Sequence, residues 1–138
     1  MMDQSRYWED FVNEKLVQGG AVTGICLVSH QGACLYSMGL LKDFEKTCDV
    51  KQILHLFNDS RKQKTSLLSV HVTGQGSLSF QVHQQTNCSL IATSAGSHIG
   101  LLMGNLPHGI LACTYTHREP EIGRAKKQFE EVCRLLRS

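Results

Sequence analysis

The chain has 138 residues, and its contents of 41% hydrophobic and 19% charged residues suit one globular domain rather than a disordered or fibrous chain. The formal net charge of +2 is too small to indicate nucleic-acid binding, and no apolar run reaches the roughly 18 residues that a membrane span requires. Because the first residues are charged and aromatic rather than apolar, we expect no secretory signal and a cytoplasmic location. The charges are unevenly distributed, since positions 65 to 117 contain no Asp, Glu, Lys or Arg.

The six cysteines and seven histidines are dispersed along the chain. No CxxC pair occurs, and no histidine lies at ligand spacing from a second one. We therefore expect thiols outside any disulfide, no metal site and no cofactor.

Apolar periodicity predicts two helices and a hairpin in the first part of the chain. Trp8, Phe11, Val12 and Leu16 share one helical face, which predicts a helix over 7–16. The apolar segments 21–29 and 33–38 flank His30-Gln31-Gly32 and predict a β-hairpin. Residues 49–57 predict a second helix, followed by a polar loop over 58–66.

Five short strands and a last helix follow, at 67–72, 77–83, 88–93, 98–103 and 109–115. Turn signals about every ten residues are typical of an antiparallel meander. The closing helix has its apolar stripe on Ala125, Phe129, Val132, Cys133 and Leu136, with Pro120 or Gly123 at its start. Strands flanked by helices indicate an α+β fold, with helices laid on an antiparallel sheet.

This element order resembles that of the profilins, as do both ends of the sequence. Trp8, Phe11 and Val12 resemble the opening of the family's first helix, and residues 21–39 resemble its first hairpin. The strongest stretch is 89–125, where Cys113-Thr114-Tyr115 is followed by Glu119-Pro120 and Gly123. The resemblance implies a single domain over 1–138, with an antiparallel sheet of about seven strands and the N- and C-terminal helices packed together on one face.

The resemblance further implies a cytoplasmic protein of the actin cytoskeleton that binds actin monomers, in a full or a weakened form. The residues that match the family's actin-binding positions lie on two strands, just after the last strand, and in the last helix. They are His71, His83, His117, Arg118, Arg124, Lys126 and Lys127. The uncharged segment 65–117 supplies no Lys or Arg, so the basic contacts are expected from the end of the chain.

Profilins also bind proline-rich peptides in an aromatic groove, and anionic phosphoinositides through basic patches. The matching positions for a proline-rich peptide are Trp8, Phe11, Tyr36, Arg134 and Leu135, and the family's strand aromatic falls at either Leu35 or Tyr36. Lys and Arg gather at 42–64 and 124–137, although Asp and Glu are interspersed in both clusters, so phosphoinositide binding has weak support from the sequence.

Two other classes of function are an enzyme and an adaptor. An enzyme has little support, because Ser29-His30 and Ser97-His98 are neighbours that point to opposite faces of a strand, and no P-loop or nucleophile-elbow motif occurs. The alternative is a roadblock- or longin-like adaptor, or a phosphoinositide-binding module without actin binding, since the first hairpin resembles that of the adaptors as well. Such adaptors form dimers, whereas a monomer with Trp8 between the terminal helices would favour the profilin interpretation.

Overall fold

The computed structural model describes most of the chain from residue 22 onward. The described residues are 10–11, 14, 22–44, 51, 53–54, 57, 67–85, 89–94, 98–107, 109–118 and 120–137. Trp8 and most of the predicted first helix therefore lie outside the described residues. No helix in the described ranges is long and apolar enough to cross a bilayer.

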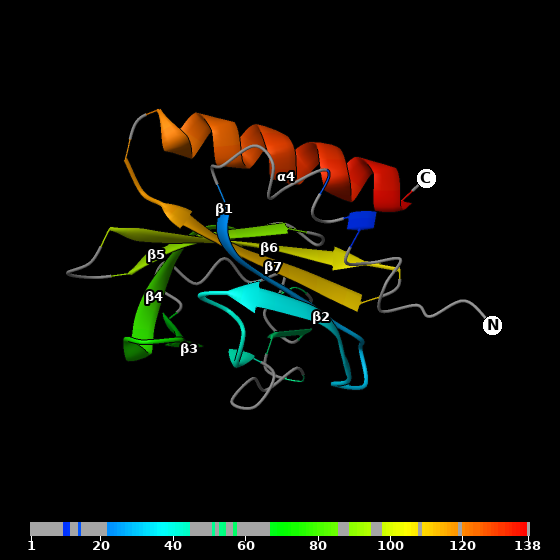
Figure 1. Cartoon of the computed structure of the whole chain (residues 1–138), viewed down its shortest axis with the longest axis horizontal. Helices are drawn as coiled ribbons and strands as arrows, with labels where there is room; N and C mark the ends of the chain where they lie inside the picture. Colours follow the sequence, from blue (N-terminus) through cyan, green and yellow to red (C-terminus); the bar gives the residue numbers. More distant parts are fainter. Residues whose placement is uncertain are drawn as a thin grey trace.

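A single antiparallel sheet of seven strands forms the centre of the molecule (Figure 1). Its order is β2-β1-β7-β6-β5-β4-β3, so the strands from β3 to β7 form a continuous meander and β1 pairs with the last strand. The bounds are β1 Val22–Val28, β2 Cys34–Gly39, β3 Leu67–Val72, β4 Gly76–Gln85, β5 Ser89–Ser94, β6 Ile99–Leu106 and β7 Gly109–Thr116. The predicted hairpin and the five predicted strands are thus confirmed, with shifts of up to three residues at their ends.

The side-chain pattern of each strand explains its place in the sheet. In β3, Leu68, Val70 and Val72 are buried and the residues between them are not, which is the alternation of a strand covered on one face. Nearly every residue of β6 and β7 is buried, because these central strands are covered on both faces.

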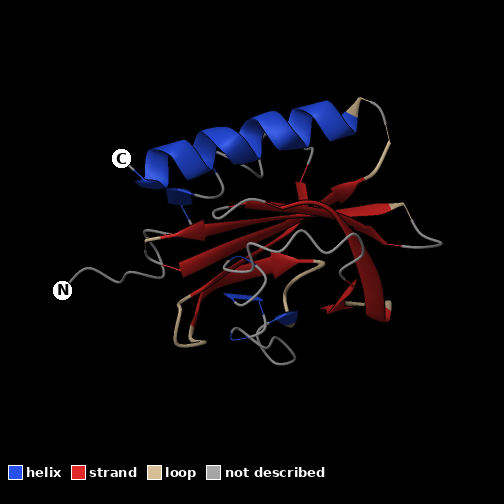
Figure 2. Ribbon diagram, turned by 180° about the vertical axis from the view of Figure 1, so that it is seen from behind, coloured by secondary structure: helices blue, strands red, loops and turns tan. Residues whose placement is uncertain are grey.

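One long helix, α4 (Glu121–Arg137), lies across one face of the sheet (Figures 1 and 2). The predicted apolar stripe faces the sheet, since Ala125, Phe129, Val132 and Cys133 are buried. The helix begins directly after Pro120, and Gly123 is an exposed residue within its first turn rather than its boundary.

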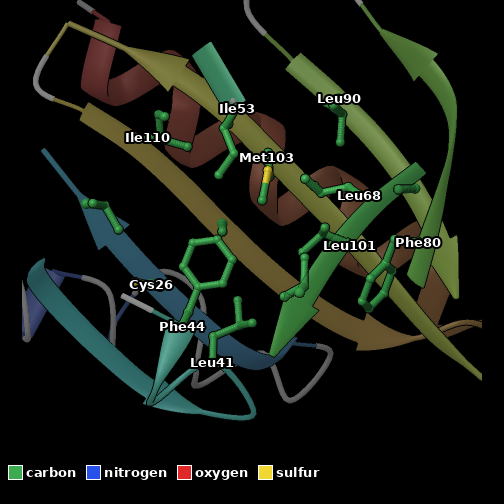
Figure 3. Close-up of a cluster of buried hydrophobic side chains, with 14 of the residues drawn as sticks. Cys26, Leu41, Phe44, Ile53, Leu68, Phe80, Leu90, Leu101, Met103 and Ile110 are labelled. Carbon is green, nitrogen blue, oxygen red and sulfur yellow. The ribbon is translucent and has the colours of Figure 1, made fainter. Parts of the chain in front are cut away.

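Two hydrophobic cores lie on the two faces of the sheet. The helix-side core joins α4 to Leu27, Leu102 and other strand residues, and Phe11 packs against it. The far-side core contains Leu41, Phe44, Ile53 and Phe57, from the segment between β2 and β3, against the strand residues Leu68, Phe80, Leu90, Leu101 and Met103 (Figure 3). Ile53 and Phe57 are helical, as predicted for 49–57. Phe11, also helical, lies on the α4 side of the sheet, which agrees with the predicted packing of both terminal helices on one face.

Candidate binding face beside the last helix

A row of polar groups crosses the helix side of the sheet beside the start of α4. The strand register places Thr93 opposite Gly100, and Gly100 opposite Tyr115. A β-bulge between Val82 and Gln84 sets His83 in the same row, where its Nε2 is hydrogen-bonded to Thr93 Oγ1. We call His83, Thr93, Tyr115 and His117 the polar row.

Tyr115 holds the middle of the polar row in place. Its ring covers Gly100 so closely that a Cβ built on this glycine would lie 2.1 Å from Tyr115 Cζ. The phenol oxygen is 3.3 Å from His117 Nδ1, and the two ring centroids are 5.8 Å apart. Burial raises the pKa of the Tyr115 phenol above its ordinary value of 10.0, so the phenol stays neutral at physiological pH.

Four basic residues lie at or near the start of α4, which follows the last strand of this row. Arg118, Arg124 and Lys127 are exposed, and Lys126 is half-buried. The Ile122 N–H donates to the Arg118 carbonyl at 3.1 Å, so Arg118 sits at the very start of the helix. A helix N-terminus carries partial positive charge of its own, so these side chains make this end of α4 electropositive, offset in part by Glu121. We call Arg118, Arg124, Lys126 and Lys127 the basic cluster.

His71 is placed apart from the other predicted actin-binding residues. It is half-buried on β3 and pairs with Ser77 at the beginning of β4, whereas His83 lies near the end of that strand. Six strand residues correspond to roughly 20 Å. The structure therefore brings His83, His117 and the basic cluster to one end of the helix side, and His71 to a different part of the same sheet.

The residues predicted to bind a proline-rich peptide are only partly brought together. Phe11 and Tyr36 both pack against the helix-side core, as does Leu35, while Trp8 lies outside the described residues. Leu135 is half-buried, and exposed Arg134 lines a groove next to β5. Because four strand spacings of about 4.8 Å separate β5 from β2, Arg134 lies on the opposite flank of α4 from Tyr36.

A groove of about 410 Å³ between α4 and strands β5 and β6 was not predicted from the sequence. Leu102, Phe129 and Cys133 form a buried floor, and the charged rim comes from α4. The complete lining is Ser89, Leu90, Ile91, Leu102, Lys126, Phe129, Glu130, Cys133 and Arg134. Lys126 belongs both to this groove and to the basic cluster, so the two features form one continuous surface. The groove is large enough to receive an apolar side chain of a partner.

The cysteines of the described ranges are mostly buried. Cys26, Cys34, Cys113 and Cys133 form no disulfide, whereas Cys48 and Cys88 lie outside those ranges. Burial, and secondarily the nearby Cys133, raise the pKa of the Cys113 thiol well above its ordinary value of 9.0. No group of three or more His, Cys, Asp or Glu residues in the described part of the chain could hold a metal ion.

Comparison with known proteins shows the fold. No family model matches the chain, and no curated protein sequence matches it. Among solved structures, profilin IA of Acanthamoeba castellanii has a TM-score of 0.66 and 16% identity, over 94% of this chain and 95% of that one. LokiProfilin1, solved in complex with rabbit actin, has a TM-score of 0.64 and 14% identity, over 94% and 96% of the two chains. A more distant likeness is to MglB in a tetrameric arrangement, with a TM-score of 0.51 and 15% identity, over 99% of this chain and 89% of that one.

Proposed function

We propose that this profilin-fold chain binds monomeric actin through the basic cluster of α4 and the polar row beside it. The observation that carries the proposal is the basic cluster at the start of α4, next to a groove with an apolar floor, on a fold that matches a profilin solved with actin. A standard protein interface buries about 800 Å² on each partner and depends on a few apolar or Arg anchors. The groove supplies an apolar pocket, and Arg118 and Arg124 supply guanidinium anchors.

Because of the charge distribution, we expect weaker actin binding than a uniformly basic face would give. We also expect the binding to depend more strongly on α4. The exposed residues of β3 and β4 on the helix side are uncharged, and they include Ser69, Ser79 and Gln81. On this face, among the described residues, electrostatic steering then comes from the basic cluster at the start of α4, and it decreases as salt screens these exposed charges. We therefore expect weakened actin binding with a marked salt dependence.

The test is a charge-reversal pair measured in an actin-assembly assay with labelled actin. Arg124→Glu together with Lys127→Glu reverses two of the three exposed cations of the basic cluster and leaves Arg118 unchanged. The matched control, Lys42→Glu together with Lys51→Glu, makes the same change in net charge at exposed positions outside α4 and the groove. We expect the wild type and the control to slow nucleation and the Arg124/Lys127 variant to have lost most of this effect. Absence of any effect of the wild-type chain at tens of micromolar would refute actin binding.

Two further properties are proposed with less support from the geometry. Phe11 and Tyr36 pack against the same core, whereas Arg134 is on the other flank of α4. The proline-binding surface is therefore reduced to the side of Phe11 and Tyr36. We expect weak binding of a proline decamer, with a change in Trp8 fluorescence at millimolar peptide. Anionic phosphoinositides would bind at the basic cluster and compete with actin, and cytoskeletal localisation would follow from actin binding.

An adaptor of the roadblock or longin type is the second candidate function, favoured by the likeness to MglB. An adaptor on this fold would recognise another protein without affecting actin. The assembly assay separates the two candidates, because only the first predicts an effect on nucleation that depends on Arg124 and Lys127.

A further inference from the structure

Within the described residues, the strand β3 forms an edge of the sheet whose own residues lack the usual protection against pairing, and the segment after β2 contacts this edge at Thr73. In the described part of the chain only β4 pairs with it. Its sequence, LLSVHV, contains no charge and no proline, although natural edge strands commonly carry Lys or Pro to prevent association with another strand. At the opposite edge, the large side chains of β2, Leu35, Tyr36 and Met38, pack against the helix-side core.

The direction of the backbone groups shows which residues of β3 could form new hydrogen bonds. The Thr73 N–H donates to the Leu40 carbonyl at 2.9 Å, away from β4, while the Val72 carbonyl accepts from the Gln75 N–H within the hairpin turn. Backbone groups alternate in direction along an antiparallel strand. His71, Ser69 and Leu67 therefore direct their N–H and carbonyl groups outward, as Thr73 does.

The side chains of the same three residues are accessible on the helix side of the sheet. Leu67 is 66% exposed, and among the described residues no other large hydrophobic side chain is exposed. Ser69 is exposed and His71 is half-buried, whereas Leu68 and Val70 point into the far-side core. The edge therefore combines outward backbone groups with one unprotected apolar side chain.

We propose that this edge pairs with the β3 edge of a second copy of the chain, in antiparallel orientation about a twofold axis at Ser69. The outward residues then oppose one another: Ser69 faces Ser69 of the second copy, and Leu67 faces His71 of the second copy. This register forms about six backbone hydrogen bonds and covers Leu67 on both chains. It keeps the two helix sides on the same side of a continuous sheet, so neither far-side core is disturbed.

A second copy fits this edge because the register is self-complementary and free of repulsion. The residues from 65 to 117 carry no Asp, Glu, Lys or Arg, so neither β3 nor β4 brings like charges together when two copies meet. Like charges directly opposite each other on paired strands would be destabilising. The resemblance also assigns His71 of this edge to actin, but the pairing is measured without actin, so its failure is distinguishable from a failure of actin binding.

The first test is sedimentation velocity from micromolar to several hundred micromolar protein, on the wild type and two lysine variants. Ser69→Lys places two ammonium groups opposite each other at the axis, and we expect it to raise the dimer dissociation constant by at least about tenfold. Ser79→Lys is the matched control, because Ser79 is also exposed and lies directly opposite Ser69 on the neighbouring strand β4, away from the edge. It should change the dissociation constant by no more than about twofold.

The outcomes of this test are distinct. A dimer weakened by Ser69→Lys and not by Ser79→Lys supports the edge pairing. A dimer that both substitutions leave intact, or that both abolish equally, would place the interface elsewhere and overturn it. A wild-type chain that stays monomeric over the whole concentration range also overturns pairing with a second copy. The edge would then be a binding site for an extended segment of a different protein.

Cross-linking provides a second measurement of the register. Residues opposite each other in a hydrogen-bonded antiparallel pair have Cα atoms about 5.5 Å apart, within the range that a disulfide bridges. Ser69→Cys, oxidised by glutathione disulfide, should therefore give a dimer joined through position 69, as identified by peptide mass spectrometry. Ser79→Cys should give none at position 79, and an equal yield from both variants would contradict the register.

Discussion

The close contact between Gly100 and Tyr115 leads to the sharpest stability prediction. A methyl group at position 100 would lie 2.1 Å from Cζ, 2.4 Å from Cε1 and 2.5 Å from the phenol oxygen of Tyr115. The ring is fully buried and cannot give way without disturbing the helix-side core. Overpacking of this kind costs about 1–3 kcal/mol, so we expect Gly100→Ala to lower the free energy of unfolding by at least that amount.

The assay is urea unfolding of a double-mutant cycle with Tyr115→Ala, which removes the ring. If the ring is the obstacle, Gly100→Ala should cost little in the Tyr115→Ala background, and the coupling energy should exceed about 1 kcal/mol. Gly123→Ala is the matched control, because Gly123 is exposed in α4 and a Cβ there meets nothing within 4 Å. It should stabilise the chain by about 0.5–1 kcal/mol through helix propensity. A Gly100→Ala chain as stable as the wild type would refute the packing described for Tyr115.

Two more predictions concern the helix-side core. Phe129 is 4% exposed in the floor of the groove, so Phe129→Ala should lower the free energy of unfolding by about 3–5 kcal/mol. The control is Lys127→Ala at an exposed position, which should change it by less than about 0.5 kcal/mol in the same urea titration. The unfolded Cys113 thiol ionises near pH 9.0 and the folded one only at higher pH, so the free energy of unfolding should fall as pH rises above about 9. Cys113→Ala should reduce that slope between pH 9.0 and 10.0, and a slope equal to that of the wild type would show that the buried thiol is not its source.

Most of the fold could be predicted from the sequence because its signals are local. The alternation of Leu68, Val70 and Val72 with polar residues, and the stripe from Ala125 to Cys133, each follow the period of one element. The sequence leaves two boundary residues open for the start of α4, Pro120 and Gly123. Only the structure shows that the helix begins between them.

The candidate site was predicted less completely because it depends on contacts between elements. The polar row requires the register of β5, β6 and β7, which joins Thr93, Gly100 and Tyr115 from three separate segments. The position of Arg134 depends on how α4 is rotated over the sheet, and the resemblance alone placed it with Tyr36. For the groove, the one signal in the sequence is the spacing of Lys126, Glu130 and Arg134, which share one face of a helix.

The central claim, that the start of α4 and the polar row bind monomeric actin, is tested most directly by amide NMR of the labelled chain with actin held monomeric. Signals from residues 117–127 and from His83 and Thr93 should be attenuated first, and those of Tyr36 on β2 should follow only through overall tumbling. The attenuation should disappear in the Arg124→Glu and Lys127→Glu variant. Unchanged spectra at excess actin, or attenuation confined to β2 and Phe11, would contradict the claim.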